Sequence, residues 1–117
     1  MPTEKDGTVI IILKEPGEPA IPTFMGTELE DMQKTIGGGH VTNTNIHNYG
    51  LLDDVICMVD EDARMKKLPF NFRLGGPLND TIFGPAYFCA MDKKYNLISL
   101  TNIQTEAIAG WLYVREQ

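Results

Sequence analysis

The only concentrated basic group in the sequence lies between residues 64 and 73 and is interleaved with aromatic side chains. Its members are Arg64, Lys66, Lys67, Phe70, Asn71 and Arg73. Arginine binds a phosphate or carboxylate through paired hydrogen bonds, and an aromatic ring can stack on a planar base. The segment therefore predicts a binding site for a small anionic, nucleotide-like ligand. The alternative is a packed loop in which Leu68, Phe70 and Phe72 point inward and the charges face water. Asn71 is the polar residue that we expect to bond the loop backbone.

A second polar stretch covers residues 40–47, where polar side chains alternate along an expected strand. Alternation places Asn43, Asn45 and His47 on one face, which predicts a secondary binding groove. His40 and His47 are seven residues apart and fall on opposite faces, an arrangement that does not suit one acid–base pair. The alternative is an exposed strand that carries surface histidines.

No combination of residues in the sequence forms a catalytic or metal-binding signature. The glycine run 37–39 is followed by His40 and Val41 rather than by the Lys-Ser/Thr of a phosphate-binding loop. Cys57 and Cys89 each lie in an apolar run, which predicts small buried side chains. We therefore expect a protein that is not an enzyme and that uses no metal and no cofactor.

Charge is divided unevenly along the chain. Residues 1–62 contain 12 acids and three lysines, a net charge of −9, and residues 63–117 contain four acids and seven bases, a net charge of +3. The sum of −6 argues against direct binding of nucleic acid, which rests on a basic surface. The acidic half supports an alternative hypothesis, an acidic DNA mimic that inhibits a host DNA-binding protein. The acids at 53–54 and 60–62 predict an exposed acidic rim.

The elements that must position these residues fit one domain of 117 residues, with a loose segment at 1–7. Strands are predicted at 8–13, 20–25, 40–47, 54–59, 81–84, 85–91 and 97–98. Pro19 and Pro22 confine the second of them to a sheet edge. Because strands and helices do not alternate regularly, we expect an α+β fold with a mixed or antiparallel sheet and two packed helices.

Both helices are predicted from capping boxes, in which the first and fourth residues satisfy each other's backbone donors. Thr27–Glu30 predicts a helix that ends at Gly37 and whose inward face carries Leu29, Met32 and Ile36. Thr101–Gln104 predicts a second helix, with Ile103, Ala107, Ile108, Trp111 and Leu112 on its apolar face. We expect Trp111 to be buried against the sheet.

Four features occur in order along the chain. They are a strand followed by Glu15-Pro16-Gly17; a helix that ends Ile36-Gly37-Gly38; a strand with Val59-Asp60-Glu61 that leads to Leu68-Pro69-Phe70-Asn71; and Gly84-Pro85-Ala86-Tyr87-Phe88 followed by Leu100-Thr101. Together, over residues 8–113, they resemble a small bacterial and phage domain family of unknown function, common on bacteriophages and mobile elements. Asp60-Glu61 stands where members often carry Asn-Glu. The resemblance implies a phage or mobile-element setting and supplies no chemistry.

The sequence thus predicts a non-catalytic phage or mobile-element accessory protein that binds a small anionic ligand or a host protein and counters a host process such as defence. The alternatives are the acidic DNA mimic and a structural or scaffold protein, and self-association is left open. The longest apolar run, Val9–Leu13, is too short to cross a membrane, and no signal-peptide pattern opens the chain. We therefore expect the protein in the host cytoplasm.

Overall fold

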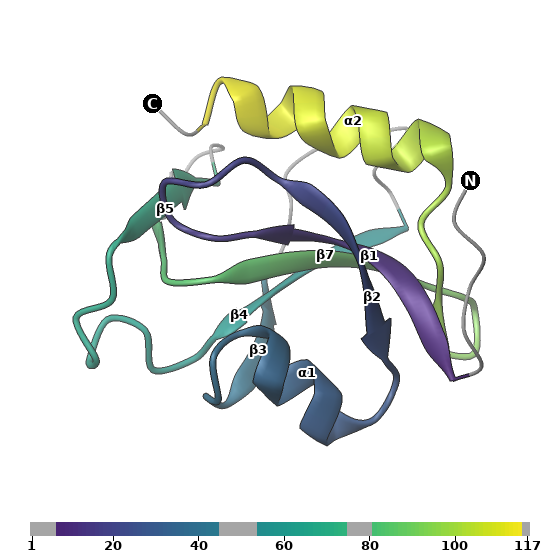
Figure 1. Ribbon diagram of the computed structural model, residues 1–117, viewed down its shortest axis with the longest axis horizontal. Coiled ribbons are helices and arrows are strands. Elements are labelled where there is room, and N and C mark those ends of the chain that lie inside the picture. Colours follow the sequence, from purple (N-terminus) through teal and green to yellow (C-terminus); the bar gives the residue numbers. More distant parts are fainter. Residues whose placement is uncertain (1–6, 45–53, 75–80, 116–117) are drawn as a thin grey trace.

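In the computed structural model, which describes residues 7–44, 54–74 and 81–115, six strands form one antiparallel sheet. Across the sheet the order is β2 (Ile21–Gly26), β1 (Thr8–Lys14), β7 (Ala86–Met91), β4 (Val55–Asp60) and β3 (Val41–Thr44), and β8 (Leu97–Ile98) pairs with β7. A separate antiparallel pair is formed by β5 (Phe70–Arg73) and β6 (Thr81–Phe83). Of the described helices, α1 (Leu29–Thr35) covers one face of the sheet and α2 (Asn102–Tyr113) the other (Figure 1).

The central strands are apolar on both faces because each face carries a hydrophobic cluster. Alternation along β1 sends Ile11 to the α1 side and Ile12 to the α2 side. On the α2 side the rings of Phe72, Phe88 and Trp111 lie with their centroids 5.9–6.0 Å apart. The predicted α+β domain with two packed helices is confirmed in outline, and the described pairings are antiparallel, with more strands than helices.

The two cysteines lie on adjacent strands but on opposite faces of the sheet. Cys57 of β4 is paired with Phe88, so Cys89, the next residue of β7, points to the other face. Both thiols are free and buried. Burial raises the pKa of both thiols, that of Cys89 to about 12, which keeps them protonated at neutral pH. The prediction of small buried side chains is confirmed.

Helix α1 begins one residue later than the sequence predicts. Its N-cap is Glu28 rather than Thr27, and the Asp31 carboxylate accepts a hydrogen bond from the Glu28 N–H at 3.2 Å. The acidic run contains two boxes of equal spacing, Thr27–Glu30 and Glu28–Asp31, and the spacing alone does not separate them. The predicted end is confirmed: Gly37 has φ of +91°, and its N–H bonds to the Lys34 carbonyl.

Helix α2 begins as predicted and buries Trp111 against the sheet. Thr101 accepts a hydrogen bond from the Gln104 N–H at 3.1 Å, and the Thr101 N–H donates to the Gln104 side chain at 2.9 Å. Trp111 is 5% exposed, which confirms the prediction. The predicted inward faces each include one exposed residue in the first turn. Leu29 is 59% exposed in α1, and Ile103 is 61% exposed in α2, where it lies five residues before the buried Ile108 and therefore on the far side of the helix.

The β5–β6 pair is tied to both α2 and the main sheet. The Arg73 N–H donates to the Arg115 carbonyl at 3.0 Å, and the Arg115 Nε donates to the Leu74 carbonyl at 3.3 Å. The Arg115 guanidinium also lies 4.3 Å from the Trp111 ring centroid. On the other side, the Nδ2 of Asn71 in β5 donates to the carbonyl of Lys14 in β1 at 2.8 Å, so the pair is held from two directions.

Candidate functional site

A tight turn at residues 61–67, between β4 and β5, presents the first residues of the predicted basic segment. The turn closes with the pair of backbone hydrogen bonds found at the C-terminal ends of helices. The Leu68 N–H donates to the Ala63 carbonyl and the Lys67 N–H to the Arg64 carbonyl, each at 3.1 Å. Lys67 occupies the left-handed position of this motif, with φ of +56°. This closure fixes the direction in which Arg64 leaves the turn.

Asp60, the last residue of β4, anchors the same turn. Its carboxylate accepts hydrogen bonds from the Lys66 ammonium at 2.6 Å and from the Asp62 N–H at 2.9 Å. Burial raises the pKa of Asp60, but the bonds from Lys66 and Asp62 outweigh burial and hold the pKa below its usual value. The expectation of an exposed acidic rim at 60–62 is therefore wrong for Asp60, which is buried because it holds the turn, whereas Glu61 stays exposed.

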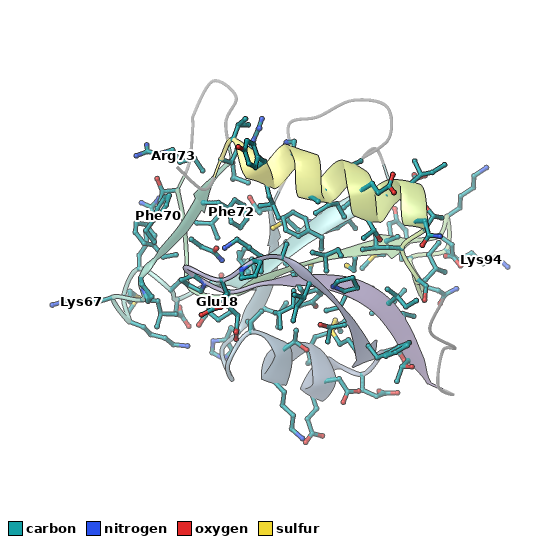
Figure 2. The ribbon with its side chains drawn as sticks, turned by 45° about the horizontal axis from the view of Figure 1, so that its top comes forward. Glu18, Lys67, Phe70, Phe72, Arg73 and Lys94 are labelled. Atoms are coloured by element: carbon teal, nitrogen blue, oxygen red, sulfur yellow. The ribbon has the colours of Figure 1, made fainter. Side chains whose placement is uncertain are left out.

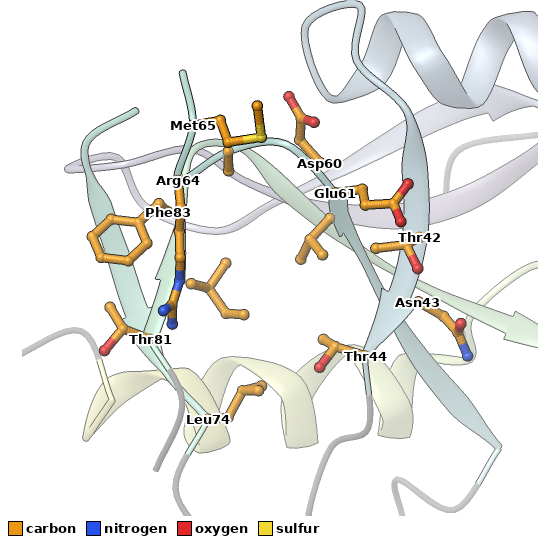
Figure 3. A pocket seen from close by; sticks show the side chains of 13 residues that line it. Thr42, Asn43, Thr44, Asp60, Glu61, Arg64, Met65, Leu74, Thr81 and Phe83 are labelled. Atoms are coloured by element: carbon orange, nitrogen blue, oxygen red, sulfur yellow. The ribbon is translucent and has the colours of Figure 1, made fainter. Parts of the chain in front are cut away.

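A cleft of about 270 Å³ opens between the β3–β4 side of the sheet and the β5–β6 pair (Figure 3). Its floor is formed by buried apolar residues, among them Val59, Leu74 and Ile82. Hydroxyl-bearing side chains line both walls, Thr42 and Thr44 on β3 and Thr81 on β6. The cleft thus combines an apolar floor with polar walls, the usual composition of a small-ligand site.

Arg64 supplies the positive charge of the cleft. Its guanidinium lies 5.5 Å from the centroid of the Phe83 ring, and Figure 3 shows its side chain running along that ring toward Thr81. Within the described residues the Arg64 side chain makes no ion pair and no hydrogen bond, so its guanidinium donors face the cleft without a protein acceptor. The carboxylates of Asp60 and Glu61 also line the cleft; that of Asp60 is paired with Lys66, and that of Glu61 offsets the charge of Arg64.

The other members of the basic segment do not join Arg64 in the cleft. Lys66 is bound to Asp60. Figure 2 shows Lys67, Phe70 and Arg73 along one side of the molecule, and the Arg73 guanidinium lies 5.9 Å from the Phe70 ring centroid. Neither Phe70 nor Arg73 lines the cleft. The structure therefore divides the predicted site into Arg64 inside the cleft and Phe70 with Arg73 outside it.

Asn71 has the structural role that its loop position predicts. It is 2% exposed, and its Nδ2 donates to the carbonyls of Lys14 and Gly84, each at 2.8 Å. These two bonds join β5 to the ends of β1 and β6. Its Oδ1 is buried and has no partner among the described residues. Asn71 also borders a second hollow, of about 460 Å³, together with Lys14 and Phe70.

The predicted secondary groove falls only partly within the described residues. Asn45 and His47 lie outside them. Asn43 lines the cleft, but Figure 3 shows its side chain pointing away from the other lining side chains. His40 is exposed, and its Nδ1 lies 3.1 Å from a carboxylate oxygen of Asp62. The structure thus brings one residue of the secondary groove and one of the basic segment, Asn43 and Arg64, to the same cleft.

Two features of the cleft were not identified from the sequence. Phe83 stacks on Arg64, and Thr42 faces Thr81 across the cleft. The available signal was the alternation of Thr81, Ile82 and Phe83, which puts the first and third on one face of β6. The sequence does not indicate the strand pairings that place β6 across the cleft from β3.

The part of the chain that the structure describes holds neither a cluster of metal ligands nor a membrane-spanning helix. Of the histidine, cysteine and acidic side chains at 7–44, 54–74 and 81–115, no three lie together so that they could hold a metal ion. No helix in this part of the chain is long and apolar enough to cross a membrane.

Comparison with known proteins gives one match. No curated protein and no solved structure matches the chain significantly. A family model described as "Domain of unknown function (DUF3846)" matches residues 8–112, which include every described helix and strand except the last residue of α2. Since the match covers nearly the whole chain, this protein belongs to the DUF3846 family of domains of unknown function.

Proposed function

We propose that this domain is a non-catalytic binding module that captures an anionic group in the cleft at Arg64. The anion belongs to a small, nucleotide-like ligand or to a partner protein of the host. The setting is a phage or mobile element acting in the host cytoplasm on a host process such as defence. Support for that setting comes from the four sequence features at residues 15–17, 36–38, 59–71 and 84–101.

One observation carries the proposal. Arg64 is stacked on Phe83 and bonded to no described acceptor, so its planar fork of donors is oriented before a ligand arrives. A guanidinium held in this way recognises a carboxylate or phosphate through two parallel hydrogen bonds at a reduced entropic cost. The apolar floor below it favours a ligand that also carries an apolar or planar part.

The cleft also sets limits on the ligand. Its volume of about 270 Å³ lies just below the roughly 300–1,000 Å³ typical of pockets for drug-sized ligands. Glu61 at the rim disfavours a second or third negative charge close to Arg64. We therefore expect a group with one or two negative charges rather than a nucleoside triphosphate.

Titration calorimetry with four probes tests this function: AMP, GMP, inorganic phosphate and N-acetylglutamate. At least one of them should bind, and Arg64→Ala should weaken its binding at least about tenfold, as loss of a charged hydrogen bond requires. Arg73→Ala is the matched control, because Arg73 also stacks on a phenylalanine but lies outside the cleft. Equal losses in the two variants, or no binding of any probe up to about 10 mM, would refute the proposed function.

A further inference from the structure

The outer edge of β3 offers backbone groups for pairing. In the β3–β4 register Val41 is opposite Asp60, and the Glu61 N–H donates to the His40 carbonyl at 2.8 Å. His40 therefore forms a hydrogen-bonded pair with Glu61, and every second residue from it, Thr42 and Thr44, also turns its backbone groups toward β4. The N–H and C=O groups of Val41 and Asn43 consequently point to the outer side of β3.

Within the described residues no strand pairs with this outer side. β3 is the last strand of the sheet order, and no backbone hydrogen bond joins Val41 or Asn43 to another described element. β3 carries no charged residue and no proline, two of the devices that prevent an edge from pairing. Its backbone is thus a template for one more strand.

The cleft lies at this edge. Asn43 lines the cleft although its side chain points away, so its backbone forms that part of the wall. Thr42 and Thr44 are paired with Val59 and Cys57, residues of the cluster on the α2 face, and their side chains therefore lie on that face. A strand added to β3 would send every second side chain to the same face. Those side chains would enter the cleft.

Arg64 defines the chemistry of the occupant. It lies on the wall opposite β3 and has no anionic partner among the described residues, so the charge that complements it is a carboxylate carried by the added strand. The floor beneath takes an apolar side chain. Main-chain bonds would then supply affinity, and the cleft would supply selectivity.

We propose that the DUF3846 cleft binds an extended segment of a partner protein, which adds as a strand to the outer edge of β3 and places a carboxylate at Arg64. This inference rests on the proposed function, since it names what carries the anion. The carboxylate comes from a glutamate or aspartate side chain or from the C-terminus of the segment.

Fluorescence polarisation with labelled octapeptides that alternate threonine and valine tests the inference. One peptide ends in a free carboxylate, a second has an internal glutamate and an amidated end, and a third has glutamine and an amidated end. We expect the first or the second to bind at least about tenfold more tightly than the third, and the one that does so identifies the source of the carboxylate. Arg64→Ala should abolish this preference, and Arg73→Ala should keep it.

N-methylation of the binding peptide tests strand addition itself. One version is methylated at every odd amide and the other at every even amide. Only one of these sets faces β3, so one version should lose at least about tenfold in affinity and the other should retain it. Equal effects would refute strand addition. If no peptide binds while AMP or inorganic phosphate binds through Arg64, the inference is wrong and the proposed function stands. If none of the probes depends on Arg64, both are wrong.

Discussion

The two edge strands of the sheet, β2 and β3, are built differently. β2 carries Pro22, which lacks a backbone N–H, and leads through a short connection into α1, which packs beside it. β3 has neither a proline nor, among the described residues, a covering helix, and it borders the cleft. One edge is thus protected in the way that prevents strand pairing, whereas the other has backbone groups without a partner among the described residues, beside a cationic side chain.

Both edges have a glycine packed against an aspartate. Beside each edge a glycine lies so close to an aspartate carboxylate that a Cβ would overlap it: Gly26 against Asp31 at the β2 edge, and Gly39 against Asp60 at the β3 edge. Asp31 is half-buried and makes one capping bond, but Asp60 is buried and held by Lys66 and by backbone. The more rigid of the two contacts is therefore that of Gly39 with Asp60, at the β3 edge, which has no neighbouring strand among the described residues (the open edge).

We expect the largest loss of stability from a substitution in the core, which affects both edges of the sheet alike. Trp111 packs on Phe72 and Phe88 beneath the centre of the sheet, so Trp111→Ala should lower the free energy of unfolding by about 3–5 kcal/mol in urea titration. Tyr113→Ala is the control in the same helix, since Tyr113 is 70% exposed, and it should cost less than about 0.5 kcal/mol. A loss below about 1 kcal/mol for Trp111→Ala would show that α2 is peripheral to the core.

The next effect separates the two parts of the basic segment. Asn71→Ala would leave the buried carbonyls of Lys14 and Gly84 without their donors, and it should cost about 2–4 kcal/mol of stability. Arg64→Ala removes no described hydrogen bond, so its unfolding midpoint should stay close to that of the wild type. If Arg64→Ala were the more destabilising variant, Arg64 would be structural rather than poised for a ligand.

The paired glycines provide a direct test of the two edges. Gly39→Ala should cost about 1–3 kcal/mol, because the buried Asp60 carboxylate must move away from its partners. Gly26→Ala should cost less, since the Asp31 side chain can rotate toward solvent and loses a single capping bond. Equal costs in chemical denaturation would show that the carboxylate at the open edge is no more rigid than the one at the protected edge.

A smaller effect depends on pH. The pKa of Asp60 is lower in the folded protein than its usual value of 3.8, so ionised Asp60 stabilises the fold above about pH 4. This contribution should be lost as the pH falls through the folded-state pKa. Asp60→Asn should show a weaker fall in unfolding midpoint between about pH 4 and pH 2 than the wild type. Identical pH profiles would mean that the bonds from Lys66 and Asp62 do not stabilise the charged form.

The elements were largely predictable because their signals are local. The continuous apolar run at Thr8–Leu13 predicted a strand, Pro22 predicted an edge strand, and Thr101–Gln104 predicted the start of α2. Where two local signals had equal weight, as at Thr27 and Glu28, the prediction was off by one residue. The buried thiols followed from their apolar neighbours in the same way.

The cleft was less predictable because it depends on contacts between distant residues. Arg64 was identified from the type of residue and its basic surroundings. However, nothing in residues 61–73 indicates that Lys66 turns to Asp60 and that Arg73 leaves the cleft. Phe83 and Thr42 come to the same cleft as Arg64 only through the pairing of β6 with β5 and of β3 with β4. Charge and residue type thus predicted the kind of site, and the sheet order decided which residues form it.

The most direct test of the central claim is an NMR titration that follows the Nε–Hε signal of each arginine. The probes are AMP, inorganic phosphate and the glutamate-bearing octapeptide, added separately to the wild-type protein. We predict that the Arg64 signal shifts and saturates with at least one probe, together with the amide signals of Thr42, Thr44 and Thr81, while the Arg73 signal moves little. An Arg64 signal that stays in place with all probes, or that shifts no more than the Arg73 signal, would contradict the claim that the cleft captures an anion.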